Sequence, residues 1–483
     1  MSRSRLAAFL ATGAAACLGL LGCVWYLYPQ CSDQIHNGSE TDVDCGGACA
    51  PCAIGLACRS GADCANGNCV GERCTPLPCF NGVRDGAETD VDCGGGTCRR
   101  CAGARHCLAD GDCFSGTCEP GTSTCSSLRT VSFAAAVSYP AGSKTYALFS
   151  GDLNGDGLVD LAAANEEGDS ISVFLNGGGG TFQRGAADFA TGAYPTGGAI
   201  ADFNRDGVAD IATANYHGNS VSILLGVGDG TFDPAAHYPT ASGAETSNLA
   251  LGDLDGDGYL DVVATNPATG SVSLFMGLPD GTLGPARNVP VGTGNSAPFS
   301  AAIGDFDGDG KNDLAIAEMI SRTIVVRLGN GDGTLRPEVA FPVGGTPAYI
   351  LIAYDVNLDG KLDLVCANRG SDDVSVLLGR GDGTFLDPIV SSTGAGTGPY
   401  SVAVADFNLD GVPDLVTANF MSGTASVLLG IGDGSFEAPL DAGTMGNFTY
   451  GVVAGDFDGD GKPDFAACNA VSNDVAVKLN TSN

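Results

Sequence analysis

The sequence predicts an all-β fold, a seven-bladed β-propeller with a small disulfide-rich region at its N-terminus. Three observations support this prediction. An acidic nonapeptide recurs seven times at intervals of 50 to 52 residues, short alternating stretches separate the copies, and the 483 residues include 74 Gly. So much Gly in a chain that is 44% apolar is typical of many turns around a filled core, not of long helices.

The charge balance excludes one class of partner. The chain has 56 Asp and Glu but only 22 Lys and Arg, which gives a net charge of −34 at pH 7. Such a protein repels a phosphate backbone, so we expect no binding of nucleic acid through counterion release. The same charge suits a protein that binds cations.

Residues 1–28 have the pattern of an export signal. Arg3 and Arg5 precede an uncharged apolar run at residues 6–28. The residues that lead to Cys23 resemble the lipobox of bacterial lipoproteins, in which this Cys is lipidated. The run is also long enough to span a bilayer as an uncleaved anchor. Both alternatives place the remainder outside the cytoplasm, anchored to the cell envelope by this segment only.

Two cysteine-rich modules follow, at residues 31–74 and 79–125. Each has eight Cys in fewer than 50 residues, too few to build an apolar core, so we expect disulfides to supply the stability. Eight cysteines allow 105 pairings, and we assign none. A zinc site at the closely spaced Cys pairs is the alternative, which an even Cys count outside the cytoplasm disfavours.

Both modules contain the sequence Glu-Thr-Asp-Val-Asp-Cys-Gly-Gly, at residues 40–47 and 88–95. Clustered acids beside Gly are able to bind calcium, and a solvated turn explains them equally well. The modules resemble cysteine-rich repeats of bacterial surface proteins, which implies a stalk and no activity.

The repeats occupy residues 130–483. Each has an acidic nonapeptide, two alternating stretches, a Gly-Asp-Gly turn in most copies and a last short stretch. Four short strands in about 50 residues, punctuated by Gly and Asp, indicate a propeller blade. The seventh copy stops after its third strand, and residues 131–139 match the missing fourth. We therefore expect this N-terminal strand to pair into the last blade and close the ring.

The seven copies resemble FG-GAP/VCBS repeats, the calcium-binding blades of integrin α-subunit propellers and of many bacterial surface proteins. The resemblance covers residues 130–483, where the spacing, the acid pattern and the Gly-Asp-Gly turn recur. It implies a seven-bladed propeller but no particular ligand, because one fold hosts many functions.

Each nonapeptide has the form Asp-x-Asp/Asn-x-Asp-Gly-x-x-Asp, which predicts a calcium site. Side-chain oxygens at positions 1, 3, 5 and 9 and the backbone carbonyl at position 7 can converge on one hard cation, and Gly at position 6 permits the sharp bend. The predicted ligands are Asp152, Asn154, Asp156, Leu158, Asp160, Asp202, Asn204, Asp206, Val208, Asp210, Asp253, Asp255, Asp257, Tyr259, Asp261, Asp305, Asp307, Asp309, Lys311, Asp313, Asp355, Asn357, Asp359, Lys361, Asp363, Asp406, Asn408, Asp410, Val412, Asp414, Asp456, Asp458, Asp460, Lys462 and Asp464.

Turn preference is the alternative for these loops, because Asp and Asn favour turns. It accounts for one loop but not for seven with the same positions filled. Magnesium fits less well, since it resists dehydration. We expect calcium as the cofactor, with a structural role, because an ion that binds only the folded chain adds to its stability.

No catalytic motif is evident. The sequence has four scattered His and no HExxH, G-x-S-x-G or phosphate-binding Gly loop. Cys366 and Cys468 stand where other copies have small residues or Ile, which indicates packing and not nucleophiles. The residues that break the sevenfold pattern, and so are the candidates for an enzyme, are Glu166, His217, Glu318 and Arg369.

A set of aromatic residues forms the candidate ligand-binding surface. Five of the seven copies have one six residues before the first Asp, at the start of the expected innermost strand. The loops after the second strand open on this same face and vary most, and in resembling integrin propellers this face binds the partner. Packing of the rings between blades is the alternative, favoured by the usual place of aromatic side chains in cores. The candidate ligand-binding residues are Tyr146, Phe299, Tyr349, Tyr400, Tyr450, Tyr216 and Arg369.

We therefore expect an exported, monomeric propeller that binds a glycan or an extracellular protein through its variable face. The propeller has no Trp, which weakens the glycan alternative, although Tyr can substitute. An enzyme acting on extracellular polysaccharide, which resembling propellers sometimes are, and a purely architectural role are the other hypotheses.

Overall fold

The computed structural model describes the propeller and small parts of the N-terminal region. The described ranges are 69–70, 73–74, 106–109, 118–119, 123–125, 131–292, 296–346 and 348–482. Two compact units divide the chain, Met1–Cys101 with Arg105–Cys125 and Ala102–Ala104 with Ser126–Asn483. The predicted export segment and lipidation site at Cys23 lie outside the described residues. Within those ranges, no helix has the length and apolar character needed to cross a membrane.

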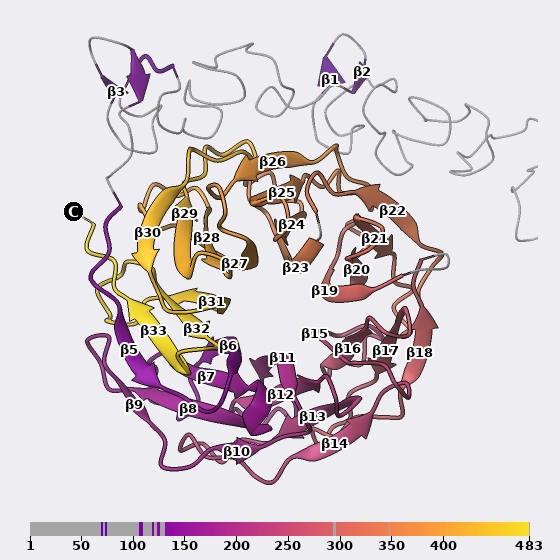
Figure 1. Ribbon diagram of the computed structural model, residues 1–483. Helices are drawn as coiled ribbons and strands as arrows, with labels where there is room; N and C mark the ends of the chain where they lie inside the picture. The colour runs from indigo at the N-terminus through magenta and orange to yellow at the C-terminus, as the bar shows by residue number, and fades with distance from the viewer. Residues whose placement is uncertain are drawn as a thin grey trace, which may run out of the picture. The chain divides into compact units, whose positions relative to one another are not determined.

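The second unit is a seven-bladed β-propeller, which confirms the predicted fold class (Figure 1). Each blade is an antiparallel sheet whose first strand lies nearest the centre of the ring. From the first blade to the seventh, the innermost strands are β6 (Thr145–Gly151), β11 (Pro195–Ala201), β15 (Leu249–Gly252), β19 (Pro298–Gly304), β23 (Ala348–Tyr354), β27 (Pro399–Ala405) and β31 (Thr449–Gly455).

The second and third strands form the buried middle of each blade. The second strands are β7 (Asp160–Asn165), β12 (Asp210–Asn215), β16 (Asp261–Asn266), β20 (Asp313–Glu318), β24 (Asp363–Asn368), β28 (Asp414–Asn419) and β32 (Asp464–Asn469), and every residue in them is buried. The third strands are β8 (Ser170–Asn176), β13 (Ser220–Leu224), β17 (Ser271–Phe275), β21 (Thr323–Arg327), β25 (Asp373–Leu377), β29 (Thr424–Leu428) and β33 (Asp474–Lys478).

Outer strands complete the blades and are mostly exposed. They are β14 (Ala236–Pro239), β18 (Arg287–Pro290), β22 (Val339–Pro342), β26 (Ile389–Ser392) and β30 (Leu440–Thr444) in blades two to six. In the first blade two short strands, β9 (Phe182–Arg184) and β10 (Phe189–Ala190), both pair with β8, because the chain leaves the sheet between them. The outer edge of that blade therefore differs from the predicted single fourth strand.

The core lies between neighbouring blades. Seven apolar clusters each combine residues from two adjacent blades, such as Phe306 of the fourth blade with Leu364 of the fifth. Each blade has a neighbouring blade on both faces, so its middle strands are covered on both sides. This explains their near-continuous apolar sequence. Cys366 and Cys468 belong to this core, and burial raises the pKa of both thiols to about 12.

The N-terminal strand closes the ring, as the sequence predicts. Strand β5 (Val137–Pro140) pairs antiparallel with β33, with Tyr139 opposite Val475. Phe133 forms a further bridge with Asn480, and its ring centroid lies 4.9 Å from that of Phe465. The last blade thus receives its fourth strand from the other end of the repeat region, and β5 covers the edge of β33.

In the first unit, the described residues form two small hairpins and one disulfide. Strand β1 (Cys69–Val70) pairs with β2 (Arg73–Cys74), and β3 (Cys118–Glu119) pairs with β4 (Thr124–Cys125). Cys107 and Cys118 are bridged, with Cα atoms 5.9 Å apart. This pair agrees with the expected disulfides; the acidic sequences at 40–47 and 88–95 lie outside the described residues.

Candidate functional site

The seven acidic loops share one backbone conformation. Each joins the first strand of a blade to the second, and in each the N–H of Gly at position 6 donates to the Asp at position 1. The N–H at position 7 donates to the Asp at position 5. Gly is needed at position 6, because its φ is 84° at Gly157 and 86° at Gly207, a left-handed conformation.

The Asp at position 9 has a role that the ligand pattern did not reveal. In all seven loops its side chain is fully buried, and its two oxygens accept backbone N–H groups from two different segments. At Asp261 the donors are Leu254 and Gly277, each at 2.8 Å. This carboxylate ties its loop to the turn after the third strand. Burial, with smaller contributions from Asp255 and Asp253, raises its pKa to about 6.

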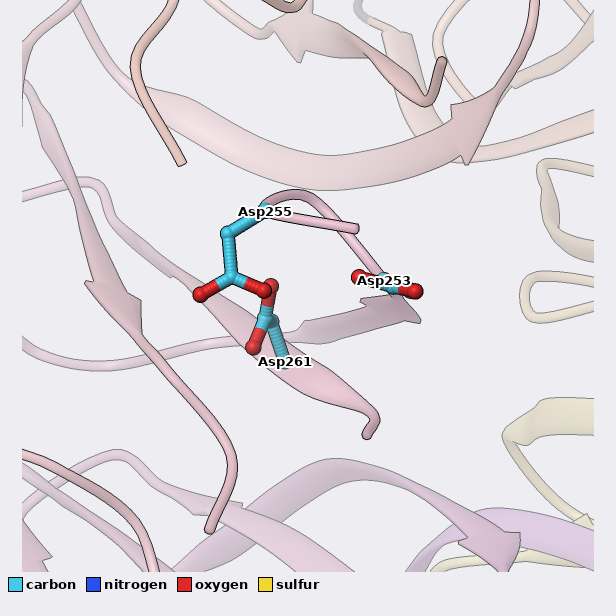
Figure 2. Close-up of side chains that lie close together, drawn as sticks. All are labelled: Asp253, Asp255 and Asp261. Atoms are coloured by element: carbon cyan, nitrogen blue, oxygen red, sulfur yellow. The ribbon is translucent and has the colours of Figure 1, made fainter. Parts of the chain in front are cut away.

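Three loops bring three carboxylates together. One oxygen from each of Asp253, Asp255 and Asp261 lies within 4.8 Å of the other two (Figure 2). The equivalent group in the fourth blade is Asp305, Asp307 and Asp313. In the seventh blade the group is Asp456, Asp458 and Asp460, which has the Asp at position 5 in place of the one at position 9. These are the three loops with Asp, not Asn, at position 3. Converging carboxylate oxygens are the ligands that calcium prefers, so the residues present fit that ion.

Neighbouring cations distinguish these three loops from one another. In the fourth, Arg336 lies 3.5 Å from Asp307 and 3.2 Å from Asp309. In the seventh, Lys462 lies 3.1 Å from Asp460. Within the described part of the chain, no Lys or Arg pairs with an acid of the third loop. The third loop therefore combines four acidic side chains with no competing ion pair.

At the other end of the innermost strands, the five predicted aromatic residues form one cluster. The Tyr146 and Tyr450 rings stack at 4.2 Å, and the Tyr349 ring lies 4.9 Å from Tyr400 and 4.8 Å from Phe299. Tyr400 is only 4% exposed, whereas the other four rings are half-buried. The rings pack on one another across blades and still present part of their surface.

This cluster stands at one end of a central cavity of about 400 Å³. Tyr146, Tyr400 and Tyr450 line the cavity together with small and aliphatic residues of the innermost strands. The hydroxyls of Tyr146 and Tyr400 are hydrogen-bonded to each other, and burial raises the pKa of both phenols. They remain neutral at physiological pH.

The two other predicted ligand-binding residues differ in their surroundings. The Arg369 guanidinium lies 4.0 Å from the ring centroid of Phe420 and donates to the Tyr349 hydroxyl at 3.3 Å, so it adjoins the aromatic cluster. The Tyr216 hydroxyl donates to Glu245 at 2.7 Å, and burial, followed by this bond, raises its pKa to about 12. No described ring contact joins Tyr216 to the cluster.

The four pattern-breaking residues occupy separate blades and have separate partners. Glu166 pairs with Lys144 at 2.9 Å, and His217 packs against Tyr194 with ring centroids 4.3 Å apart. Glu318 is 1% exposed, and the Ser296 hydroxyl lies 2.7 Å from both of its carboxylate oxygens. Among the described contacts, none brings two of these four side chains together as an acid and a base.

A second cavity, of about 470 Å³, was missed by the sequence prediction. It lies between the sixth, seventh and first blades, and Phe420, Phe448 and Tyr450 line it. Phe448 is 44% exposed. The sequence contains a signal for Phe448. This residue stands two positions before Tyr450, as Lys144 stands two positions before Tyr146, and the position varies freely between copies.

Comparison with known proteins identifies the repeats. Six overlapping segments match the FG-GAP-like repeat family, at residues 152–213, 202–264, 253–316, 305–365, 355–417 and 409–467. No curated protein sequence is significantly similar to the chain.

Solved structures match the chain at low sequence identity. A virginiamycin B lyase from Staphylococcus aureus is 10% identical with a TM-score of 0.50, covering 71% of this chain and 99% of that one. An Agrocybe aegerita lectin, described as recognising non-reducing terminal N-acetylglucosamine, is 21% identical with a TM-score of 0.44, covering 71% and 86%. At this identity, the likeness to the lyase shows the fold alone. With the repeat matches spanning more than half of the chain, the protein belongs to the FG-GAP-like repeat family.

Proposed function

We propose that the protein is an exported, envelope-anchored, calcium-stabilised propeller that binds a glycan or an extracellular protein. The apolar run at residues 6–28 and the disulfide between Cys107 and Cys118 support the extracellular location. The chain acts as a monomer whose N-terminal segment holds it at the envelope.

Calcium is the proposed ion of the acidic loops. The clustered carboxylates of the third, fourth and seventh blades support it, because three converging charges with no ion between them repel one another. The third loop is the proposed tightest site, since affinity rises with the number of ligand charges and no ion pair competes there.

One observation supports ligand binding most strongly, the aromatic cluster at one mouth of the ring. Half-buried rings from four blades, with Arg369 beside them, present apolar surface at the end where the loops differ most between blades. A recurring scaffold with diverse loops at one end is the arrangement of many binding proteins.

An enzyme acting on extracellular polysaccharide is the second candidate. It is favoured by Glu318, which lines a cavity of about 420 Å³ together with Ser296 and Glu338. Burial raises the pKa of Glu318, a property of general acids. The Ser296 hydroxyl and the Ala297 backbone N–H both donate to Glu318, however, and such donors suit a structural carboxylate equally well.

Size-exclusion chromatography with light scattering, on the calcium-loaded chain mixed with polysaccharides, tests these functions. Intact polysaccharide that co-elutes with the protein supports binding, and shortened polysaccharide establishes the enzyme. If neither occurs, cross-linking to extracellular proteins decides whether the partner is a protein, and its failure contradicts the binding function.

A further inference from the structure

We propose that the cavity between the sixth, seventh and first blades binds a single pyranose ring of a glycan. The inference rests on the proposed binding function and assigns it a place and a ligand class. The cavity lies beside the central aromatic cluster and shares Tyr450 with it.

Aromatic rings form one wall of this cavity. The Phe420 ring centroid lies 4.7 Å from Phe448 and 4.9 Å from Tyr450. Arg369 stacks on Phe420 at 4.0 Å, which fixes that ring from one side. Phe448 is 44% exposed, so a ligand in the cavity can cover a ring that the fold leaves bare. The C–H face of a pyranose packs well on such a surface.

The backbone at Phe448 is held in an unfavourable conformation. Its φ is 56°, where a side chain meets its own backbone at a cost of roughly 1–2 kcal/mol. The sixth blade has Gly398 at the equivalent position, with φ of 57°, so glycine would satisfy the backbone without strain. Lys144, Tyr194 and Glu245 have the same left-handed φ in other blades, so the conformation belongs to the turn. What distinguishes Phe448 is a large, 44% exposed ring at this position, on the rim of a cavity.

Polar groups also line the cavity. Lys144 Nζ lies 2.9 Å from Glu166 and 3.6 Å from Glu167, and its backbone N–H donates to Asn473 Oδ1 at 2.6 Å. The hydrogen bond that the Lys144 ammonium donates to Glu166 raises the pKa of Lys144, which therefore stays a charged donor. The ammonium, the Glu167 carboxylate and the Asn473 amide are donors and acceptors held in place before a ligand arrives.

This mixed lining favours a sugar over an apolar peptide side chain. A pyranose offers C–H groups on one face and hydroxyls at its edge, so it can contact both the aromatic and the polar residues. An apolar side chain would cover the aromatic wall but would desolvate Lys144 and Glu167 without replacing their hydrogen bonds with water. The cavity volume is within the range of small-ligand sites.

Saturation-transfer NMR on the calcium-loaded full chain tests the proposal, with the methyl glycosides of glucose, galactose, mannose and N-acetylglucosamine as probes. We expect at least one probe to bind. Phe448→Gly should weaken that binding by about tenfold or more, because the stacking surface is lost while the backbone relaxes. Phe448→Tyr, which keeps the ring, should bind as the original chain does.

Two further variants make the test specific. Tyr354 is also 44% exposed but ends the innermost strand of the fifth blade beside an acidic loop, so Tyr354→Ala should leave sugar binding unchanged. Lys144→Met keeps the length of the side chain and removes its charge. This variant should bind a sugar more weakly and an apolar ligand more tightly.

Each outcome decides a different point. Sugar binding that Phe448→Gly does not affect overturns this site and leaves the binding function in place. Saturation transfer from none of the four probes overturns the sugar class. In that case the chromatography and cross-linking described above still test the binding function independently. Sugar binding that Lys144→Met leaves unchanged or strengthens overturns the contribution of the polar groups, and with it the argument for a sugar in this cavity.

Discussion

The two ends of the innermost strands differ in how much the blades resemble one another. At one end, seven loops repeat the same hydrogen bonds and each carries a fully buried Asp. At the other end, equivalent positions hold Lys144, Tyr194, Glu245 and Phe448, which share a left-handed backbone and little chemistry. Uniform residues are what a structural role requires in every blade, whereas diversity at equivalent positions allows one distinct site. We therefore propose that the acidic end holds the ring together and that the aromatic end carries the ligand site.

The largest expected effect is a loss of stability from a substitution at the acidic end. Asp261→Ala removes the acceptor of two buried N–H groups, and we expect it to lower the free energy of unfolding by about 3 kcal/mol or more. Chemical denaturation measures this loss. The matched control is Asp280→Ala, in an exposed turn of the same blade, which should change stability far less. Equal losses of unfolding free energy in the two variants would show that the buried Asp contributes no more to stability than an exposed one.

A smaller effect concerns differences among the acidic loops. Arg336→Gln removes the cation beside Asp307 and one of the two beside Asp309, where Lys311 remains. Calcium should therefore bind the fourth loop more tightly by about 1 kcal/mol, or roughly fivefold. A calorimetric calcium titration measures the change. Arg184→Gln, whose partner Asp188 lies outside the loops, is the control. A weaker calcium affinity in Arg336→Gln would mean that Arg336 supports the loop instead of competing with the ion.

The variable end should respond in the opposite sense. Phe448→Gly relieves a left-handed backbone but loses a ring contact. We therefore expect the melting temperature to stay the same or rise, with a gain of no more than about 1 kcal/mol in the free energy of unfolding. Thermal unfolding followed by circular dichroism measures it. A marked loss of stability would assign Phe448 to the core and remove the argument that it serves a ligand.

The smallest effect concerns a residue that departs from the pattern inside the second strands. Six blades end this strand with Asn, and the fourth ends it with Glu318, whose pKa is raised above 4.5 by burial. Below pH 4.5 the carboxyl is protonated in both states. As the pH rises through the raised pKa, ionisation is opposed only in the folded state, so the fold loses stability.

Glu318→Asn should therefore flatten the fall in melting temperature above pH 4.5 relative to the original chain. Glu167→Gln changes an exposed acid and should leave the slope unaltered. A steeper slope in Glu318→Asn would mean that the Ser296 and Ala297 donors outweigh the cost of burial.

The sequence predicts the repeated features well, because each is encoded in seven copies. The spacing of the acidic loops predicts the blades, and the incomplete seventh copy predicts that β5 completes it. The cavity at Phe448 could not be predicted in the same way. It depends on ring closure, which brings Lys144 of the first blade beside Phe448 of the seventh, and on a left-handed φ that the sequence does not display. The role of the buried Asp was hidden because its backbone partners lie in two different segments.

The melting temperature of the full chain, measured in calcium and again after chelation, tests the central claim most directly. Ions that bind only the folded state stabilise it by about 2.7 kcal/mol per site at a hundredfold excess over Kd, so we expect chelation to lower the melting temperature clearly. An unchanged melting temperature would contradict the assignment of the acidic end as the calcium-dependent support of the ring.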